Sequence, residues 1–248
     1  LRSLVGSEMC IRDSAMTASI PQVQALALER IRADVRSMHA YHVQPSQGLL
    51  KMDTMENPFR LPPELQAALG ERLGRLEINR YPGERQEVLK DMLARYAQAP
   101  AGSAVLLGNG SDEIITLLAL ACAQPHAEGR ATMLAPMPGF VMYPMSARLQ
   151  GLDFVGVNLT ADFELDVPAM RSAIAEHRPA ITYIAYPNNP TATLWAEADV
   201  QAVIDAVGAI GGLVVMDEAY QPFARRSWAE NMLSLIHISE PTRLLSIS

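Results

Sequence analysis

Apolar side chains recur every three or four positions through much of the first hundred residues. This spacing is typical of helices that bury one face, and it predicts helices over residues 21–38, 63–73 and 84–97. Prolines and glycines interrupt the pattern over 41–63, which predicts an irregular arm. The run Arg80-Tyr81-Pro82-Gly83 predicts a turn.

After residue 100, short apolar runs alternate with longer segments of helical spacing. The predicted strands cover 104–107, 131–134, 153–157, 181–186 and 213–216. The predicted helices between them cover 112–123, 141–149, 167–176 and 196–209. This alternation predicts an α/β fold with a mostly parallel sheet and helices on both faces. Ligands of such sheets bind at the carboxyl ends of the strands, so the informative residues should directly follow them.

Composition narrows the class of protein. The chain has 248 residues, of which 49% are hydrophobic and 19% charged, enough for a sizeable core and unlike a disordered or collagen-like chain. A net charge of −7 argues against non-specific nucleic-acid binding. The chain shows neither an apolar run long enough to span a membrane nor a signal peptide. Cys10 and Cys122 cannot form a disulfide scaffold, so we expect a cytoplasmic protein.

The two ends of the chain resemble the translation of a transposon-end adapter used in DNA sequencing libraries. One choice of codons for residues 4–14, reverse-complemented and shifted in frame, gives residues 233–243. We therefore expect 1–14 and 233–248 to be artefacts and exclude them from the predicted fold. On this view the natural chain continues beyond residue 232.

The first strand-end motif runs from Leu106 to Glu113 and contains Gly108 and Gly110. A strand that passes through glycines into a helix offers free backbone N–H groups and a helix dipole, which together favour an anion such as phosphate. A plain loop in which Ser111 or Asp112 caps the helix fits the same residues. No lysine follows, so the motif is not a Walker loop, and a third glycine of the dinucleotide pattern is missing.

Two further motifs follow predicted strands. Tyr186-Pro187-Asn188-Asn189-Pro190-Thr191 either is a simple turn or presents an asparagine amide, held between prolines, to an anionic oxygen. Leu213 to Tyr220 ends a buried strand in Asp217-Glu218. A Walker B acid there would need the missing lysine loop, whereas a carboxylate that keeps a heterocyclic nitrogen protonated would not.

Other catalytic patterns are absent from the sequence. There is no Gly-x-Ser-x-Gly elbow and no cysteine pair with metal-ligand spacing, so we predict no metal site. His39, His42, His126 and His177 are scattered along the chain and are expected to be surface or packing residues.

The three strand-end motifs, taken in this order, resemble the fold-type I pyridoxal-phosphate aminotransferases of class I and II, and most closely the histidinol-phosphate aminotransferases. The resemblance covers essentially all of residues 15–232. Three further segments match that family's arm, tyrosine turn and ring-stacking segment: Met55-Glu56-Asn57-Pro58-Phe59, Arg80-Tyr81-Pro82-Gly83 and Pro138-Gly139-Phe140-Val141-Met142-Tyr143.

The resemblance implies a pyridoxal 5'-phosphate site. Gly110, Ser111 and Asp112 would hold the cofactor phosphate, mainly through backbone N–H groups. Tyr81 would reach the phosphate in the partner subunit of a homodimer. Phe140 would lie over the pyridine ring.

The rest of the implied site concerns the ring's polar atoms and the substrate. Asn189 and Tyr220 would hydrogen-bond the phenolic oxygen of the ring. Asp217 would pair with the ring nitrogen, so that the ring accepts electrons from the substrate. Tyr41 and Asn57, in the arm, would lie near the substrate.

The resemblance also implies a domain division. Residues 15–99 would form the N-terminal helix, the arm and the start of the small and large domains. Residues 100–232 would form part of the large, cofactor-binding domain, with most of the small domain missing.

Two positions depart from the family's pattern. Ala192 stands where a glycine usually follows Asn-Pro-Thr, and we expect its methyl group only to narrow the loop's conformations. The family's Schiff-base lysine would lie beyond Tyr220, where neither Lys51 nor Lys90 matches. The 248-residue chain is therefore expected to be inactive.

The implied reaction converts histidinol phosphate and 2-oxoglutarate to imidazole-acetol phosphate and glutamate, in histidine biosynthesis. The partners would be small amino and keto acids, not nucleic acid or membrane. Another class I/II aminotransferase and a threonine-phosphate decarboxylase share the same cofactor site and remain alternatives. So does a non-catalytic, truncated relative that only binds cofactor.

Overall fold

A computed structural model of the chain describes residues 28–38, 45, 47–50, 57, 59–81, 83, 85–101, 103–124, 129–231 and 236–238. The chain divides into two compact units, Leu1–Gln44 and Pro45–Ser248. In the first unit the described residues contain a short helix, α3 (Ala33–Arg36). Within 28–38 the predicted helix over 21–38 is interrupted: Leu28, Glu29 and α3 are helical, but the backbone between them leaves helical geometry at Ile31 and Arg32. Leu28 and Ile31 are 51% and 46% exposed, so their burial contributes little to a continuous helix.

The second unit is built on a parallel sheet. Its strands are β1 (Thr132–Met137), β2 (Asp153–Asn158), β3 (Ile181–Ala185), β4 (Leu213–Asp217) and β5 (Ile236–Ile238). Their order across the sheet is β2-β1-β3-β4-β5, and every neighbouring pair is parallel. The prediction of a parallel α/β fold is confirmed. β5 lies in the segment that the sequence analysis set aside, and no strand was predicted there.

The helices of the second unit agree with prediction to within one or two residues at most ends. They are α4 (Pro63–Gly74), α5 (Arg85–Tyr96), α6 (Ser111–Ala121), α7 (Met142–Gln150), α8 (Val167–His177) and α9 (Glu197–Ala209), followed by the short 3-10 helices η2 (Gln221–Phe223) and η3 (Trp228–Asn231). The start of α8 illustrates how local sequence sets the beginning of a helix. The Asp166 carboxylate accepts a hydrogen bond from the Ala169 N–H at 2.9 Å and caps its first turn, and a proline occupies that turn.

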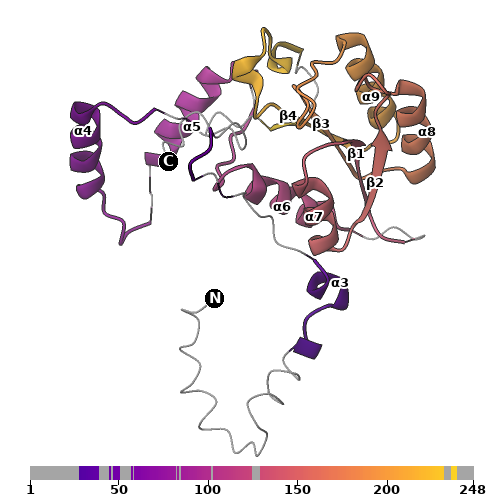
Figure 1. Cartoon of the computed structure of the whole chain (residues 1–248), viewed down its shortest axis with the longest axis horizontal. Helices are drawn as coiled ribbons and strands as arrows, with labels where there is room; N and C mark the ends of the chain where they lie inside the picture. The colour runs from indigo at the N-terminus through magenta and orange to yellow at the C-terminus, as the bar shows by residue number, and fades with distance from the viewer. Residues whose placement is uncertain are drawn as a thin grey trace, which may run out of the picture. The chain divides into compact units, whose positions relative to one another are not determined.

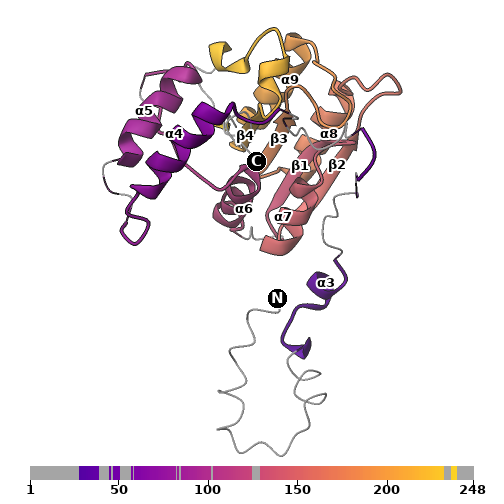
Figure 2. The same cartoon turned by 60° about the vertical axis from the view of Figure 1, so that its left-hand side comes forward.

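Helices α6 and α7 cover one face of the sheet, and α8 and α9 cover the other (Figures 1 and 2). This sidedness follows from the strand order. The step from β1 to β2 runs across the sheet in one direction, and the steps from β2 to β3 and from β3 to β4 run in the other. Since crossovers between parallel strands are right-handed, a reversal of direction places the connecting helices on opposite faces.

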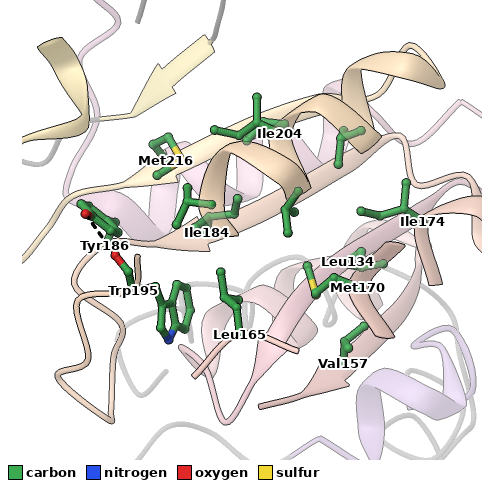
Figure 3. Packing of buried hydrophobic residues seen from close by; sticks show 14 of the residues in the cluster. Leu134, Val157, Leu165, Met170, Ile174, Ile184, Tyr186, Trp195, Ile204 and Met216 are labelled. Carbon is green, nitrogen blue, oxygen red and sulfur yellow. Dashed lines mark hydrogen bonds between the residues drawn. The ribbon is translucent and has the colours of Figure 1, made fainter. Parts of the chain in front are cut away.

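Each face of the sheet carries its own hydrophobic core, because successive side chains of a strand point to opposite faces. On β4, Val214 and Met216 belong to the core beneath α8 and α9, and Val215 belongs to the core beneath α6 and α7. The first core also contains Trp195 and Tyr186 (Figure 3). The Tyr186 hydroxyl donates a hydrogen bond to the Trp195 carbonyl at 3.3 Å.

One predicted strand is absent from the sheet. Residues 104–107 lie in the described part of the chain but belong to neither helix nor strand, and Leu106 is 66% exposed. A strand requires a neighbour for its backbone hydrogen bonds, and no described strand pairs with this segment. Within the described residues, no helix is both long and apolar enough to cross a membrane.

Candidate functional site

Five of the residues singled out in the sequence surround one small cavity at the carboxyl ends of β3 and β4. The cavity is lined by Ser111, Phe140, Ala185, Asn189, Asp217, Ala219 and Tyr220. The pairing of Ala185 with Asp217 brings the last residues of β3 and β4 side by side. Segments that are up to 109 positions apart in sequence, from Ser111 to Tyr220, therefore meet at one point.

This point coincides with a reversal of the strand order. β1 lies between β2 and β3. The chain steps from β1 to β2 toward one edge of the sheet and then from β2 to β3 toward the other edge, so the order of strands reverses between β1 and β3. The loop after β1 carries Phe140, and the loop after β3 carries Asn189. Loops that leave adjacent strands toward opposite faces open a crevice between them, and open α/β sheets bind ligands there.

Asp217 supplies the only carboxyl group among the residues that line the cavity. Its side chain lies at the end of β4, 8% exposed, and both oxygens are engaged. Oδ1 accepts a hydrogen bond from the Ala219 N–H at 3.1 Å, and Oδ2 accepts one from the Tyr143 hydroxyl at 2.6 Å. The short second distance is typical of a hydroxyl that donates to a charged carboxylate.

Glu218, the next residue along the chain, serves a different purpose. Its oxygens accept hydrogen bonds from the Ser227 hydroxyl at 2.9 Å and from the Trp228 N–H at 2.6 Å. Glu218 thereby holds the start of η3 against the end of β4, and it does not line the cavity that contains Asp217. Of the two adjacent acids, Asp217 is the one available to a ligand at the strand ends.

Tyr143 was not predicted as a site residue. It lies in the first turn of α7, 1% exposed, and the centres of its ring and the Phe140 ring are 5.6 Å apart in an edge-to-face arrangement. On its other side the Tyr183 ring stacks on it at 4.5 Å and 22°. The sequence could have placed Tyr143 beside Phe140, because residues three positions apart lie on one side of a helical turn. An aromatic residue that only packs in the core would show the same spacing. The contact with Asp217 is what indicates a role at the site.

The two asparagines after β3 have different roles. The Asn188 amide is buried and donates to the Pro138 carbonyl at 3.2 Å and to the Thr191 hydroxyl at 2.8 Å. It therefore ties the loop after β3 to the loop after β1. Asn189 is half-buried and lines the cavity.

The N-terminus of α6 forms another wall. Gly110 precedes the helix with a φ of 77°, a conformation that glycine adopts without strain, and no side chain caps the helix. Ser111 is buried and lines the cavity, whereas Asp112 is exposed and does not. Glu113 instead accepts hydrogen bonds from the backbone and side-chain nitrogens of Asn109. The start of an α-helix presents backbone N–H groups and the positive end of the helix dipole, a combination that favours an anion.

Gly139 permits the close turn between β1 and Phe140. A Cβ atom at this position would lie 2.5 Å from the Pro136 carbonyl oxygen. Because that oxygen belongs to the backbone, no side-chain rotation can relieve the clash. Any other residue there would displace the loop that carries Phe140.

The predicted site residues of the arm and the tyrosine turn have a different outcome. Tyr81 is 99% exposed and does not line the cavity. Asn57 is exposed, and its Oδ1 accepts a hydrogen bond from the Phe59 N–H at 3.0 Å. Tyr41 lies outside the described residues. No group of metal-ligating side chains is present in the part of the chain that the structure describes.

Ala192 adopts a left-handed backbone with a φ of 58°, in the loop between β3 and α9. This conformation costs a residue with a Cβ about 1–2 kcal/mol. Glycine would relieve this strain but would also give the unfolded chain more conformational entropy, which offsets part of the gain. We therefore expect Ala192→Gly to raise the free energy of unfolding by a net amount of about 0.5–1 kcal/mol. Ala161→Gly, at an exposed turn position outside the left-handed region, should lower it by a similar amount. Urea unfolding measures both, and a loss of stability in Ala192→Gly would contradict the expectation.

Comparisons with known proteins identify the family of this chain. The family profile for aminotransferase class I and II matches residues 48–241. A histidinol-phosphate aminotransferase of Paracidovorax citrulli is 73% identical over 208 residues, which cover 84% of this chain and 56% of that relative. The chain thus spans little more than half the length of the curated relatives it matches.

Solved structures show the same fold. The histidinol-phosphate aminotransferase from Clostridium acetobutylicum superposes with a TM-score of 0.66 at 21% identity, covering 80% of this chain and 57% of that one. The enzyme of the same name from Sinorhizobium meliloti, in complex with pyridoxal-5'-phosphate, has a TM-score of 0.62 at 21% identity, covering 86% and 54%. With the family profile matching more than half of its residues, this chain belongs to the class I and II aminotransferase family.

Proposed function

We propose that this chain is part of a histidinol-phosphate aminotransferase and that its cavity is the pyridoxal 5'-phosphate site. The observation that carries the proposal is the buried Asp217 carboxylate, which shares one cavity with Phe140, Asn189, Tyr220 and the start of α6. The donors and acceptors present match the parts of the cofactor: an acid for the ring nitrogen, an amide and a phenol for the ring oxygen, and helix N–H groups for the phosphate.

The residues have separate tasks in this proposal. Asp217 holds the ring nitrogen in its protonated form, and Asn189 and Tyr220 orient the ring through its phenolic oxygen. The backbone at Gly110 and Ser111 binds the phosphate, and Phe140 covers a face of the ring. Pyridoxal phosphate, when bound, supplies an electron-accepting ring that stabilises negative charge on the α-carbon of the substrate.

The choice of substrate rests on the names of the relatives. The Paracidovorax citrulli protein, 73% identical, is named for histidinol phosphate, and the other relatives at 52–71% identity carry the same name. We therefore propose histidinol phosphate and 2-oxoglutarate as substrates, in histidine biosynthesis. The small amino and keto acids of this reaction belong in the cytoplasm, and the free thiol of Cys122 is compatible with its reducing conditions.

A homodimer is part of the same proposal. Tyr81 is almost fully exposed, so its hydroxyl is available to a second chain. Helices α4 and α5 of the described structure also expose large apolar side chains: Leu65, Leu73, Val88, Met92 and Tyr96. Apolar groups gathered in this way favour burial against another surface. We propose that Tyr81 reaches the cofactor phosphate of the partner.

Among the described residues that line the cavity there is no lysine to match the one that bonds the cofactor in this family. Lys90 lies on α5 and forms an ion pair with Glu87 at 2.9 Å, and Lys51 lies outside the described residues. We propose that the 248-residue chain cannot transfer amino groups for this reason. The lysine is both the covalent anchor and the base that moves the α-proton.

A chimaera tests the proposed reaction directly. This chain up to Asn231 would be continued by the C-terminal part of the Paracidovorax citrulli relative, which is 73% identical over the shared region. The chimaera should form glutamate from 2-oxoglutarate with histidinol phosphate as donor, whereas the 248-residue chain should not. Glutamate is measured with glutamate dehydrogenase.

The chimaera with Asp217→Asn is the matched control and should lose most of this activity. A chimaera that binds pyridoxal phosphate but transfers amino groups only from other donors would overturn the choice of substrate. A folded chimaera that binds no pyridoxal phosphate would overturn the proposed site as well.

A further inference from the structure

We infer that Tyr143 is a positioning residue for Asp217: its hydroxyl fixes the carboxylate in the rotation that a ring nitrogen requires. The inference rests on the proposed function, because it concerns the same cavity. It adds a residue that does not line the cavity and was not among the predicted site residues.

The hydrogen bond joins two elements that are distant in sequence. Tyr143 lies in the first turn of α7, shortly after the loop that carries Phe140, and Asp217 ends β4. The two residues are 74 positions apart, and their atoms meet at 2.6 Å in a buried position. Any displacement of α7 relative to the sheet would therefore be transmitted to the acid as well as to Phe140.

Asp217 needs such a constraint because the terminal torsion of an aspartate is broad and nearly two-fold. The Ala219 N–H engages Oδ1, which by itself leaves the carboxylate free to swing about that bond. The Tyr143 hydroxyl engages Oδ2 and sets the plane of the group. A carboxylate oxygen can accept more than one hydrogen bond, so these two contacts are compatible with a ligand in the cavity that Asp217 lines.

Tyr143 is itself held in place, as a residue that positions another side chain must be. Its ring lies between the edge of Phe140 and the face of Tyr183. With 1% of its surface exposed, it has no space for another rotamer. The hydroxyl therefore meets Asp217 with little further loss of conformational entropy.

Tyr183 offers a matched comparison within the same stack. Its ring is fully buried, yet its hydroxyl has no hydrogen-bond partner among the residues that the structure describes. Burial raises the pKa of the Tyr183 hydroxyl well above its ordinary value, with the nearby Cys122 and Asp217 adding to the effect, so the group stays neutral. Tyr143→Phe and Tyr183→Phe remove the same atom from neighbouring rings, and only the first removes a hydrogen bond to the acid.

The test uses the 248-residue chain and two ligands, pyridoxal phosphate and an analogue in which carbon replaces the ring nitrogen. Equilibrium dialysis gives the Kd of each. Tyr143→Phe should weaken the binding of pyridoxal phosphate by about tenfold, as expected for a lost hydrogen bond to a charged group. It should change the affinity for the analogue by less than about threefold, because Asp217 has no nitrogen to hold there. Tyr183→Phe should leave both affinities within about twofold of the parent chain.

The other outcomes contradict the inference in distinguishable ways. An equal loss for both ligands would show that the hydroxyl only maintains the shape of the cavity. Unchanged affinities in Tyr143→Phe would show that Asp217 is positioned without it, and the proposed site would stand. A Tyr143→Phe chain without a cooperative thermal transition, beside a normal one for Tyr183→Phe, would assign the hydroxyl to folding instead. A parent chain that binds neither ligand would overturn the proposed site and this inference together.

Discussion

Replacing Asp217 with alanine is expected to weaken the binding of pyridoxal phosphate by about fifty-fold, the largest effect of any single change around the cavity. The change removes the only carboxyl group among the lining residues. It also leaves the Tyr143 hydroxyl and the Ala219 N–H without the acceptor that both now use. Buried donors that lose their acceptor carry a penalty of their own, which adds to the lost ion pair.

Two variants give this prediction its controls. Asp217→Asn keeps the size of the side chain and removes the charge, so it should lose most of the affinity while the protein melts normally. Asp205→Ala removes an exposed acid from α9 whose nearest partner is Gln201, and its affinity should match that of the parent chain. Equilibrium dialysis measures all three. Binding to Asp217→Ala at the parent's affinity would show that the cofactor lies elsewhere.

Trp195→Ala is expected to lower the free energy of unfolding by about 4 kcal/mol. Trp195 is 2% exposed within the core beneath α8 and α9, and its ring fills the end of that core (Figure 3). Its indole N–H also donates a hydrogen bond to the Phe163 carbonyl at 2.9 Å. Alanine would leave both a cavity and an unpaired carbonyl. Since the sheet carries Asp217 and Asn189 at its strand ends, cofactor binding should weaken along with stability.

Urea unfolding followed by circular dichroism measures this effect without relying on the fluorescence of the residue that is removed. Trp195→Phe separates the two contributions, because it keeps most of the buried area and loses only the hydrogen bond, for an expected loss of about 1–2 kcal/mol. Phe223→Ala, at an aromatic side chain that is 70% exposed, should change stability by less than about 0.5 kcal/mol. Equal losses in Trp195→Ala and Phe223→Ala would contradict the assignment of this core.

The alternation of short apolar runs with helical segments was sufficient to predict β1 to β4 and helices α6 to α9. Both periodicities are local properties of the chain. Two predictions failed within the described residues. Residues 104–107 have the apolar residues of a strand but no described strand beside them, and the apolar residues Leu28 and Ile31 before α3 are exposed.

The sequence also pointed to the segments that carry the cavity, because parallel strands bring their carboxyl ends to one edge and the motifs directly follow those strands. Which side chain of each motif faces the cavity was decided only by the tertiary structure. Asn188 ties two loops together while Asn189 lines the cavity. Glu218 holds η3 while Asp217 lines the cavity. In each pair, the residues are adjacent and chemically alike.

The sequence by itself thus determined the class of fold, the family resemblance and the strand ends that carry the site. Only the tertiary structure decided the strand order, the reversal between β1 and β3, and the pairing of Tyr143 with Asp217. The physical reason is the range of the interactions. Periodicity and turn chemistry act over a few residues, whereas a hydrogen bond between residues 74 positions apart exists only once two cores have placed a helix and a strand against each other.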